Sequence, residues 1–386
     1  MKLRRLLVLF SVEPRVAMSL VLGRLQEGWR KSRGRDFYRG SVRLGDSWRL
    51  RTTGLEGHIV ASWVSDEPEP SITISLPYPE GRLHSACYGQ RWSYLLSDVV
   101  LDVSTGAVVA NDHLIAESLR GSAQSSEYWG SLIIATTKAL RRCRRPKRVI
   151  SSPSTALPVF DVDVYGHFLL YALPNILRCR NACSETLTVL APKGTPMYIF
   201  EALNAAGVDI EVVTEPTRAV SFFLAASAYV NSGDIYGSDI ELLRATFLRS
   251  KVATETNPPM PIRIYASRSR DARGRGVPDE EALCRELEGL GFLIYHGGEM
   301  SFLEQAALFR QAELLVAPTG SGLTNMVWMD PGAHVVELGN PELLVAHEVA
   351  TAARKLNVEY RYINVLNASG CALGPRELAS LVANSA

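Results

Sequence analysis

The chain has 386 residues, 47% of them apolar, and a formal net charge of +1. This length suffices for two domains of ordinary size, and an apolar share of this kind without long low-complexity tracts excludes a mainly disordered chain. The six cysteines have no paired CxxC spacing. We therefore expect buried thiols in a reducing compartment rather than a zinc site.

The first 40 residues carry an uneven share of the charge. They hold ten basic and three acidic residues, a charge of +7, so the rest of the chain carries −6. A basic end on an acidic body favours an anionic partner, either a membrane surface or a polyanion. The apolar run Leu6 to Val12 is too short to span a bilayer, and no convincing small-x-small site follows it, as cleavage of a secretory signal would require.

A helix is expected after Pro14, because four apolar residues follow at helical spacing. They are Met18, Leu22, Leu25 and Trp29. This helix either docks on the protein body or lies on a membrane, held to anionic lipid by its basic flanks. We treat residues 1–44 as a basic N-terminal arm.

A β-rich portion between residues 45 and 115 precedes a region in which strand and helix patterns alternate. The early strands are expected at Ser71 to Leu76, Tyr94 to Leu96, Val99 to Val103 and, after a hairpin-like break at Ser104 to Ala107, Val108 to Val109. A helix is expected at about Glu127 to Arg142. The later strands are expected at Arg148 to Ser151, Leu187 to Leu190, Asp209 to Val213, Ile262 to Ala266, Phe292 to Tyr295, Leu314 to Ala317, Val335 to Leu338 and Tyr360 to Val365.

Helical segments lie between the later strands. They include Asp279 to Leu290, Ser301 to Gln311 and Leu343 to Leu356. Strand–helix alternation of this length predicts an α/β protein with parallel sheets and helices on both faces. Ser301 and Glu304 form a capping box, which marks a helix start. The Pro-rich segment Asn257 to Pro261 resists regular structure and is the best candidate for a domain junction.

The segment Glu313 to Asn325 is the most informative part of the chain. Its apolar run ends in a Pro- and Gly-containing turn, and a helical pattern follows. Such a turn aims backbone N–H groups of a helix start at one point, which suits a phosphate or a diphosphate. The alternative is that the glycines serve steric needs of the turn alone.

Several pieces surround this turn in a fixed order and spacing. They are Tyr165 to Pro174, Ile262 to Arg268, Arg275 to Glu281, Gly291-Phe292, Ser301 to Gln305, Pro331-Gly332 and Val335 to Leu338. With these pieces the chain resembles glycosyltransferase family 61 from about Tyr94 to Val365. Two positions depart from the family pattern, because Thr319 stands where His is usual and Asp279 stands where Asn is usual.

The resemblance implies a GT-B-like fold, in which two Rossmann-like domains with parallel sheets face a cleft. Together with the alternation and the β-rich N-terminal portion, it suggests an acceptor-side domain over residues 45–235. A nucleotide-sugar-binding domain would then occupy residues 236–386. The resemblance also implies an inverting transfer.

Donor-binding residues are expected beyond the carboxyl ends of the C-terminal strands. A guanidinium at Arg268 can clamp phosphate oxygens, the turn amides can cradle them, and Glu337 can accept ribose hydroxyls. Taken singly, Arg268 is equally well explained as a surface cation and Glu337 as a salt-bridge partner. The candidates, including two that the family pattern adds, are Arg268, Arg275, Thr319, Gly320, Ser321, Gly322, Asn325 and Glu337.

Glu280 and Gln305 match the family pattern and Asp279 stands at a position where it departs from it, but all three have simpler explanations. Asp279 can be the N-cap of the following helix, and Glu280 can stabilise its dipole. Gln305 lies within a capped helix, where it can bond a neighbouring loop.

The first half must supply the acceptor site and a base. His167 is the preferred base, because an imidazole can take a proton near neutral pH, although a buried structural histidine is an equal alternative. Asp163 is the second candidate. The pair Asp161 and Asp163 looks like a metal-binding DxD, but alternating residues of a strand point to opposite faces, so we expect no metal and no cofactor.

The leading hypothesis is an inverting glycosyltransferase that moves a sugar from a nucleotide-sugar donor to a glycan or lipid-linked acceptor, in the synthesis of capsule, lipopolysaccharide or another surface glycoconjugate. We expect a cytoplasmic protein, peripheral on the inner face of the membrane, with no nucleic-acid partner. Two alternatives remain: a pyruvyl-transferase-like enzyme that modifies polysaccharide, and a non-catalytic nucleotide- or glycan-binding partner of an assembly complex.

Overall fold

The computed structural model describes the chain over residues 41–42, 55–66, 69–75, 83–88, 91–111, 113–115, 141–157, 164–225, 235–248, 262–269, 277–339, 347–366 and 372–384. Several sequence-based predictions lie outside these residues. They concern the basic arm, most of the helix before Arg142, the Pro-rich junction, Asp163 and Arg275.

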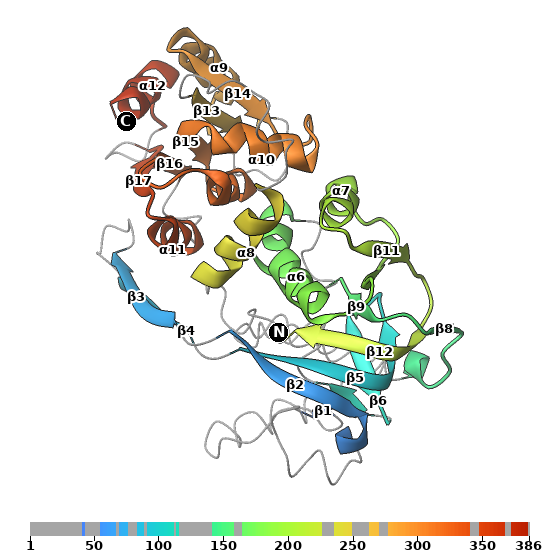
Figure 1. The fold of residues 1–386 in the computed structure, drawn as a ribbon. Helices are drawn as coiled ribbons and strands as arrows, with labels where there is room; N and C mark the ends of the chain where they lie inside the picture. The colour runs from blue at the N-terminus through green and yellow to red at the C-terminus, as the bar shows by residue number, and fades with distance from the viewer. Residues whose placement is uncertain are drawn as a thin grey trace, which may run out of the picture.

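The N-terminal half is built on a ten-stranded sheet (Figure 1). Its strands are β1 (Ser41–Val42), β2 (Ile59–Asp66), β5 (Arg91–Asp102), β6 (Ala107–Ala110), β7 (His113–Ile115), β8 (Arg148–Ile150), β9 (Ser154–Ala156), β10 (Thr188–Ala191), β11 (Asp209–Val212) and β12 (Thr217–Ala225). The short 3-10 helix η1 (Leu55–His58) precedes β2, and β3 (Glu69–Ser75) and β4 (Leu83–Tyr88) form a separate antiparallel hairpin.

This sheet is mixed, which corrects the prediction of two domains with parallel sheets. Strand β5 pairs antiparallel with β2, β6 and β12, whereas β8, β9, β10 and β11 run parallel to their neighbours. The β-rich N-terminal portion therefore continues into the same sheet as the later α/β elements. A GT-B arrangement of two Rossmann-like domains is not confirmed.

Strand β5 spans two segments that the sequence predicted as separate strands. Asp98, at φ 54°, interrupts the regular backbone between them, and the pairing with β12 continues on both sides. The predicted hairpin break after β5 is confirmed, since β5 and β6 pair antiparallel across it. An Asp102 carboxylate oxygen accepts hydrogen bonds from the Ser104 backbone and hydroxyl at this turn, and Gly106 adopts a positive φ of 70°.

The helices of the N-terminal half begin with a continuous stretch from α5 through η3 to α6, and α7 and α8 follow later in the chain. They are α5 (Tyr165–His167), the π-helical segment η3 (Phe168–Ala172), α6 (Leu173–Ala182), α7 (Met197–Ala205) and α8 (Gly237–Phe247). Helix α8 lies between α6 and the C-terminal half in Figure 1.

The C-terminal half contains a five-stranded sheet in which every pair of neighbours is parallel. The strands are β13 (Ile262–Ser267), β14 (Phe292–His296), β15 (Ala312–Pro318), β16 (His334–Gly339) and β17 (Glu359–Asn364). Each confirms a predicted strand. The near-continuous apolar runs of the central strands β13, β15 and β16 are typical of strands that are covered on both faces.

Helices cover both faces of this sheet, as expected. They are α9 (Glu280–Gly289), α10 (Phe302–Arg310), the 3-10 helix η6 (Ser321–Trp328), α11 (His347–Leu356) and α12 (Pro375–Ala383). Leu314 and Val316 pack with α9 and α12, whereas Leu315 and Ala317 pack with α10, η6 and α11. The predicted capping box of α10 is confirmed: the Ser301 and Glu304 side chains each accept a hydrogen bond from the other's backbone N–H.

The two halves share one hydrophobic core. Phe247 of α8 packs edge-on against Phe302 of α10 and Trp328 of η6, with ring centroids 5.0 and 6.0 Å apart. Buried residues of η3, α6 and α7 belong to the same cluster. This shared core fixes the two walls between which the candidate site lies.

Candidate active site

The strand order of the C-terminal sheet creates a crevice at its carboxyl edge. The order is β14-β13-β15-β16-β17, so the chain leaves β13 toward one side of the sheet and leaves β15 toward the other. Ligands of open α/β sheets bind at such a switch point. Arg268 directly follows β13 and Thr319 directly follows β15, so both predicted donor-binding segments begin at this crevice.

The turn after β15 depends on glycine. Gly320 precedes η6 with φ 149° and ψ −165°, a backbone conformation that side chains rarely allow. The Thr319 N–H donates to the Leu338 carbonyl at 2.9 Å, which ties the turn to β16. A Cβ at Gly322 would lie 3.2 Å from the Ala266 Cβ, so the turn also packs closely against the end of β13.

The Arg268 guanidinium lies against this turn. Its Nη1 donates a hydrogen bond of 2.6 Å to the Thr319 carbonyl. A Cβ at Gly320 would stand only 2.0 Å from the same nitrogen. The structure therefore brings the predicted guanidinium and the predicted glycine turn together.

Glu280 holds the end of β13 in place. One oxygen of its buried carboxylate accepts hydrogen bonds from the Tyr265 hydroxyl at 3.0 Å, the Ser267 hydroxyl at 3.0 Å and the Arg268 backbone N–H at 2.6 Å. Burial and the nearby Glu280 charge raise the Tyr265 pKa well above its usual value, which keeps that hydroxyl a donor. Asp279 occupies the N-cap position of α9, as predicted, but it has φ 51° and its side chain makes no capping hydrogen bond.

Glu337, on the neighbouring strand β16, holds Thr319 of the turn in place. Its carboxylate is fully buried and accepts hydrogen bonds from the Thr319 hydroxyl at 2.6 Å and the Tyr360 hydroxyl at 2.8 Å. Burial raises the Glu337 pKa, against the effect of these two bonds. The carboxylate does not line the pocket described next, so the predicted ribose contact finds no support in this geometry.

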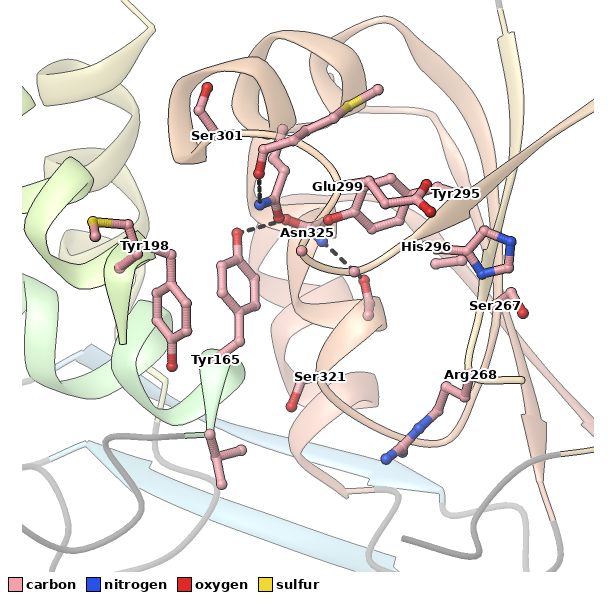
Figure 2. Close-up of a pocket in the computed structure, with 18 of the residues that line it drawn as sticks. Tyr165, Tyr198, Ser267, Arg268, Tyr295, His296, Glu299, Ser301, Ser321 and Asn325 are labelled. Atoms are coloured by element: carbon pink, nitrogen blue, oxygen red, sulfur yellow. Dashed lines mark hydrogen bonds between the residues drawn. The ribbon is translucent and has the colours of Figure 1, made fainter. Parts of the chain in front are cut away.

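A pocket of about 720 Å³ opens at the crevice, between the two halves of the chain (Figure 2). The C-terminal half contributes Ser267, Arg268, His296, Gln305, Ser321 and Asn325 among other residues. The N-terminal half contributes Val164, Tyr165, Met197, Tyr198 and Glu201. In Figure 2, Tyr165 and Tyr198 lie on the opposite side of the pocket from Arg268 and His296.

Two contacts of α5 join the pocket walls directly. The Tyr165 hydroxyl donates to the Asn325 side-chain oxygen at 2.9 Å, and burial raises the Tyr165 pKa. A Cβ at Gly166 would lie 2.8 Å from the Thr324 methyl group, so α5 approaches η6 at a distance that only glycine permits. The Tyr165 ring also meets the Tyr198 ring edge-on, with centroids 5.4 Å apart.

The preferred base, His167, lies on the same short helix as Tyr165 but does not line the pocket. Its ring packs near Tyr171, with centroids 6.1 Å apart. The second candidate, Asp163, and the donor candidate Arg275 lie outside the described residues. The roles predicted for these three residues remain predictions.

Sequence reasoning missed several pocket residues. His296 ends β14 beside Ser267, and its Nδ1 is buried without a hydrogen-bond partner among the described residues. The rule that pointed to Arg268, which follows the neighbouring strand, applies equally to His296. Tyr198 and Glu201 could not be found in this way, because their place depends on how α7 docks against α10.

Within the described ranges, no group of three or more His, Cys, Asp or Glu side chains is arranged to hold a metal ion. The same part of the chain contains no helix long and apolar enough to cross a membrane. The described Cys143, Cys179, Cys183 and Cys284 are unpaired, and burial raises the pKa of Cys143 and Cys179 to about 12.

The comparison with protein families agrees with the resemblance. The family model Glycosyltransferase 61 matches residues 165–336, so this stretch of the chain is similar to that glycosyltransferase family. The matched stretch contains both pocket walls. No curated protein matches the chain. Among solved structures, the bacterial iron-containing dodecameric glycosyltransferase TibC from enterotoxigenic E. coli H10407 is 10% identical, with a TM-score of 0.30 and coverage of 81% of this chain and 84% of that one.

Proposed function

We propose that the protein transfers a sugar from a nucleotide-sugar donor to an acceptor hydroxyl. The C-terminal half would bind the donor and the N-terminal half would bind the acceptor. The observation that carries this proposal is the contact between Arg268 and the glycine turn at the β13–β15 switch point, which opens into a pocket shared by both halves.

The diphosphate of the donor would lie at the turn. The first N–H groups of a helix have no partner within the helix, and those of Ser321 and Gly322 begin η6 at the pocket. Together with the Arg268 guanidinium they form a cradle suited to phosphate oxygens. The buried Nδ1 of His296 would bond a ribose hydroxyl or a phosphate oxygen beside them.

Transfer would proceed with inversion in a single displacement. The acceptor oxygen forms a bond to the anomeric carbon while the bond from that carbon to the diphosphate oxygen breaks. The departing electron pair stays on the diphosphate, where Arg268 and the turn amides would stabilise the developing charge. Preorganised donors of this kind often contribute a few kcal/mol to lowering a barrier. The reaction as proposed uses no metal and no cofactor.

The proposal is tested by incubating the protein with UDP- and GDP-sugars, with and without glycan acceptors, while measuring release of free nucleoside diphosphate. Release from one donor, increased by an acceptor, is the expected result. Nucleotide binding without any release would favour a non-catalytic partner of an assembly complex. Transfer of a pyruvyl group from phosphoenolpyruvate, with all sugar donors inert, would favour the pyruvyl-transferase alternative.

The acceptor proposed here is a glycan or a lipid-linked glycan of a surface polysaccharide, such as a capsule or a lipopolysaccharide. The +7 charge of residues 1–40 supports attachment to anionic lipid at the cytoplasmic face of a membrane. Sedimentation with anionic vesicles at low and high salt tests this attachment. Binding that salt does not weaken would contradict it, because surface electrostatics are screened by salt.

A further inference from the structure

Glu201 is the carboxylate that the N-terminal half contributes to the pocket. It lies on α7, four residues after Met197 and three after Tyr198, so all three side chains lie on one face of this helix. All three line the pocket. An acidic group therefore stands beside apolar and aromatic surface, in the wall opposite the donor residues.

One oxygen of Glu201 is already fixed by the C-terminal half. Its Oε2 accepts a hydrogen bond of 2.8 Å from the backbone N–H of Phe302, the first residue of α10. That N–H has no partner within its own helix. Among the described residues, this is the only hydrogen bond to the Glu201 carboxylate, so Oε1 remains for a group bound in the pocket.

The position matches a requirement of the proposed reaction. An inverting displacement needs its nucleophile on the side of the anomeric carbon opposite the leaving group. Arg268 and the glycine turn bind the leaving group from the C-terminal wall, and Glu201 belongs to the facing wall. We infer that Glu201 is the general base that activates the acceptor hydroxyl, an inference that rests on the function proposed above.

The step balances without a further reagent. Glu201 Oε1 takes the proton of the acceptor hydroxyl as the hydroxyl oxygen bonds to the anomeric carbon. The bond from that carbon to the diphosphate breaks, and the diphosphate leaves with the electron pair. The products are the glycoside, the nucleoside diphosphate and a protonated Glu201, which loses its proton to water.

Other groups of the described chain fit this role less well. His167 does not line the pocket. Tyr165 lines it, but its hydroxyl donates to Asn325 and its pKa is raised by burial, so it does not readily accept a proton. Glu299 is exposed and belongs to the C-terminal loop after β14, on the donor side.

The test compares Glu201→Gln with the full-length wild type, using the nucleotide-sugar from which the wild type releases nucleotide in the assay described above. The glutamine carbonyl oxygen can still accept from Phe302, whereas the amide cannot accept a proton. We expect kcat to fall about 10²- to 10⁴-fold, with unchanged UDP or GDP affinity by calorimetry and an unchanged Tm. Water serves as the acceptor in a parallel hydrolysis assay, so the natural acceptor need not be known. The acidic limb of the wild-type pH–rate profile should disappear in the variant.

Two further variants separate catalysis from packing. Glu241→Gln removes an exposed carboxylate of α8 and should keep wild-type activity. Glu201→Ala should lower both Tm and activity, because it also leaves the Phe302 N–H without a partner. Wild-type kcat in Glu201→Gln would overturn the inference and leave the proposed function standing. A wild-type protein that turns over no donor would overturn both.

Discussion

The backbone N–H of Arg268 donates a hydrogen bond of 2.6 Å to the carboxylate of Glu280, twelve residues further along the chain. The same carboxylate oxygen bonds the side chains of Tyr265 and Ser267, so three groups at the end of β13 converge on one buried acceptor. Arg268 in turn reaches the carbonyl of Thr319. The position of the proposed phosphate-binding guanidinium thus depends on a residue that does not line the pocket.

The Glu280→Ala substitution should therefore weaken both stability and donor binding. It leaves a buried tyrosine hydroxyl and a backbone N–H without their charged acceptor, which should lower the free energy of unfolding by about 2–3 kcal/mol. Urea denaturation measures this loss, and calorimetry with UDP or GDP measures binding. Glu280→Gln retains an acceptor oxygen and serves as the control. Equal stability of Glu280→Ala and the wild type would contradict the proposed support of β13.

Arg268→Ala should distinguish the phosphates of the ligand from its base and ribose. Because the guanidinium is assigned to phosphate oxygens, binding of UDP or GDP should weaken by about 2 kcal/mol, whereas binding of uridine or guanosine should change little. Calorimetric titrations with each pair of ligands give the comparison. If the nucleoside and the diphosphate lose the same affinity, Arg268 maintains the local fold instead of contacting phosphate.

Gly320→Ala should disturb the contact between the Arg268 guanidinium and the turn after β15. The added methyl group would start 2.0 Å from the Arg268 guanidinium, at a backbone φ of 149° that alanine rarely adopts. We expect a loss of about 1–3 kcal/mol in stability and a weaker affinity for UDP or GDP. Gly289→Ala is the matched control, because a Cβ there meets no atom within 4 Å. Similar effects of both substitutions would show that the contact with Arg268 is not the cause.

Tyr165→Phe should loosen the connection between the pocket walls. It removes the hydrogen bond to Asn325, which joins residues 160 positions apart and is only partly shielded from solvent. The expected loss is about 1 kcal/mol of stability. A double-mutant cycle with Asn325→Ala isolates this bond, and a coupling energy near zero would mean that the two side chains do not stabilise each other.

The sequence predicted the C-terminal half well, because its strands are bounded by turn residues and the central strands β13, β15 and β16 are mainly apolar and buried. The rule that ligands lie beyond the carboxyl ends of such strands then located Arg268 and the glycine turn. The N-terminal sheet was predicted less well. Strand β12 has an alternating burial pattern and pairs with β5, more than 100 residues earlier, and no local signal specifies such a partner.

Glu337 and Glu201 show where the same reasoning fails for the site. A carboxylate near a strand end can face either the ligand or a neighbouring element. The Glu337 carboxylate faces neighbouring elements, because it accepts hydrogen bonds from the hydroxyls of Thr319 and Tyr360. Glu201 is an ordinary helix residue in the sequence, and its place in the pocket follows from the packing of α7 against α10.

Glu337 also predicts a measurable pH dependence of stability. Burial raises its pKa above the usual carboxyl value of 4.5. Between that value and the raised one, the folded protein binds more protons than the unfolded chain, so stability falls as the pH rises through this range. The effect amounts to about 1.4 kcal/mol for each pH unit that separates the folded and unfolded pKa values.

Glu337→Gln should lack this fall, because its amide can pair with both hydroxyls and does not titrate. Urea denaturation of both proteins between pH 4 and pH 8 should therefore show the stability of the wild type declining relative to the variant. A wild type that gains stability relative to the variant over this range would mean that the hydrogen bonds to Thr319 and Tyr360 outweigh burial and lower the Glu337 pKa.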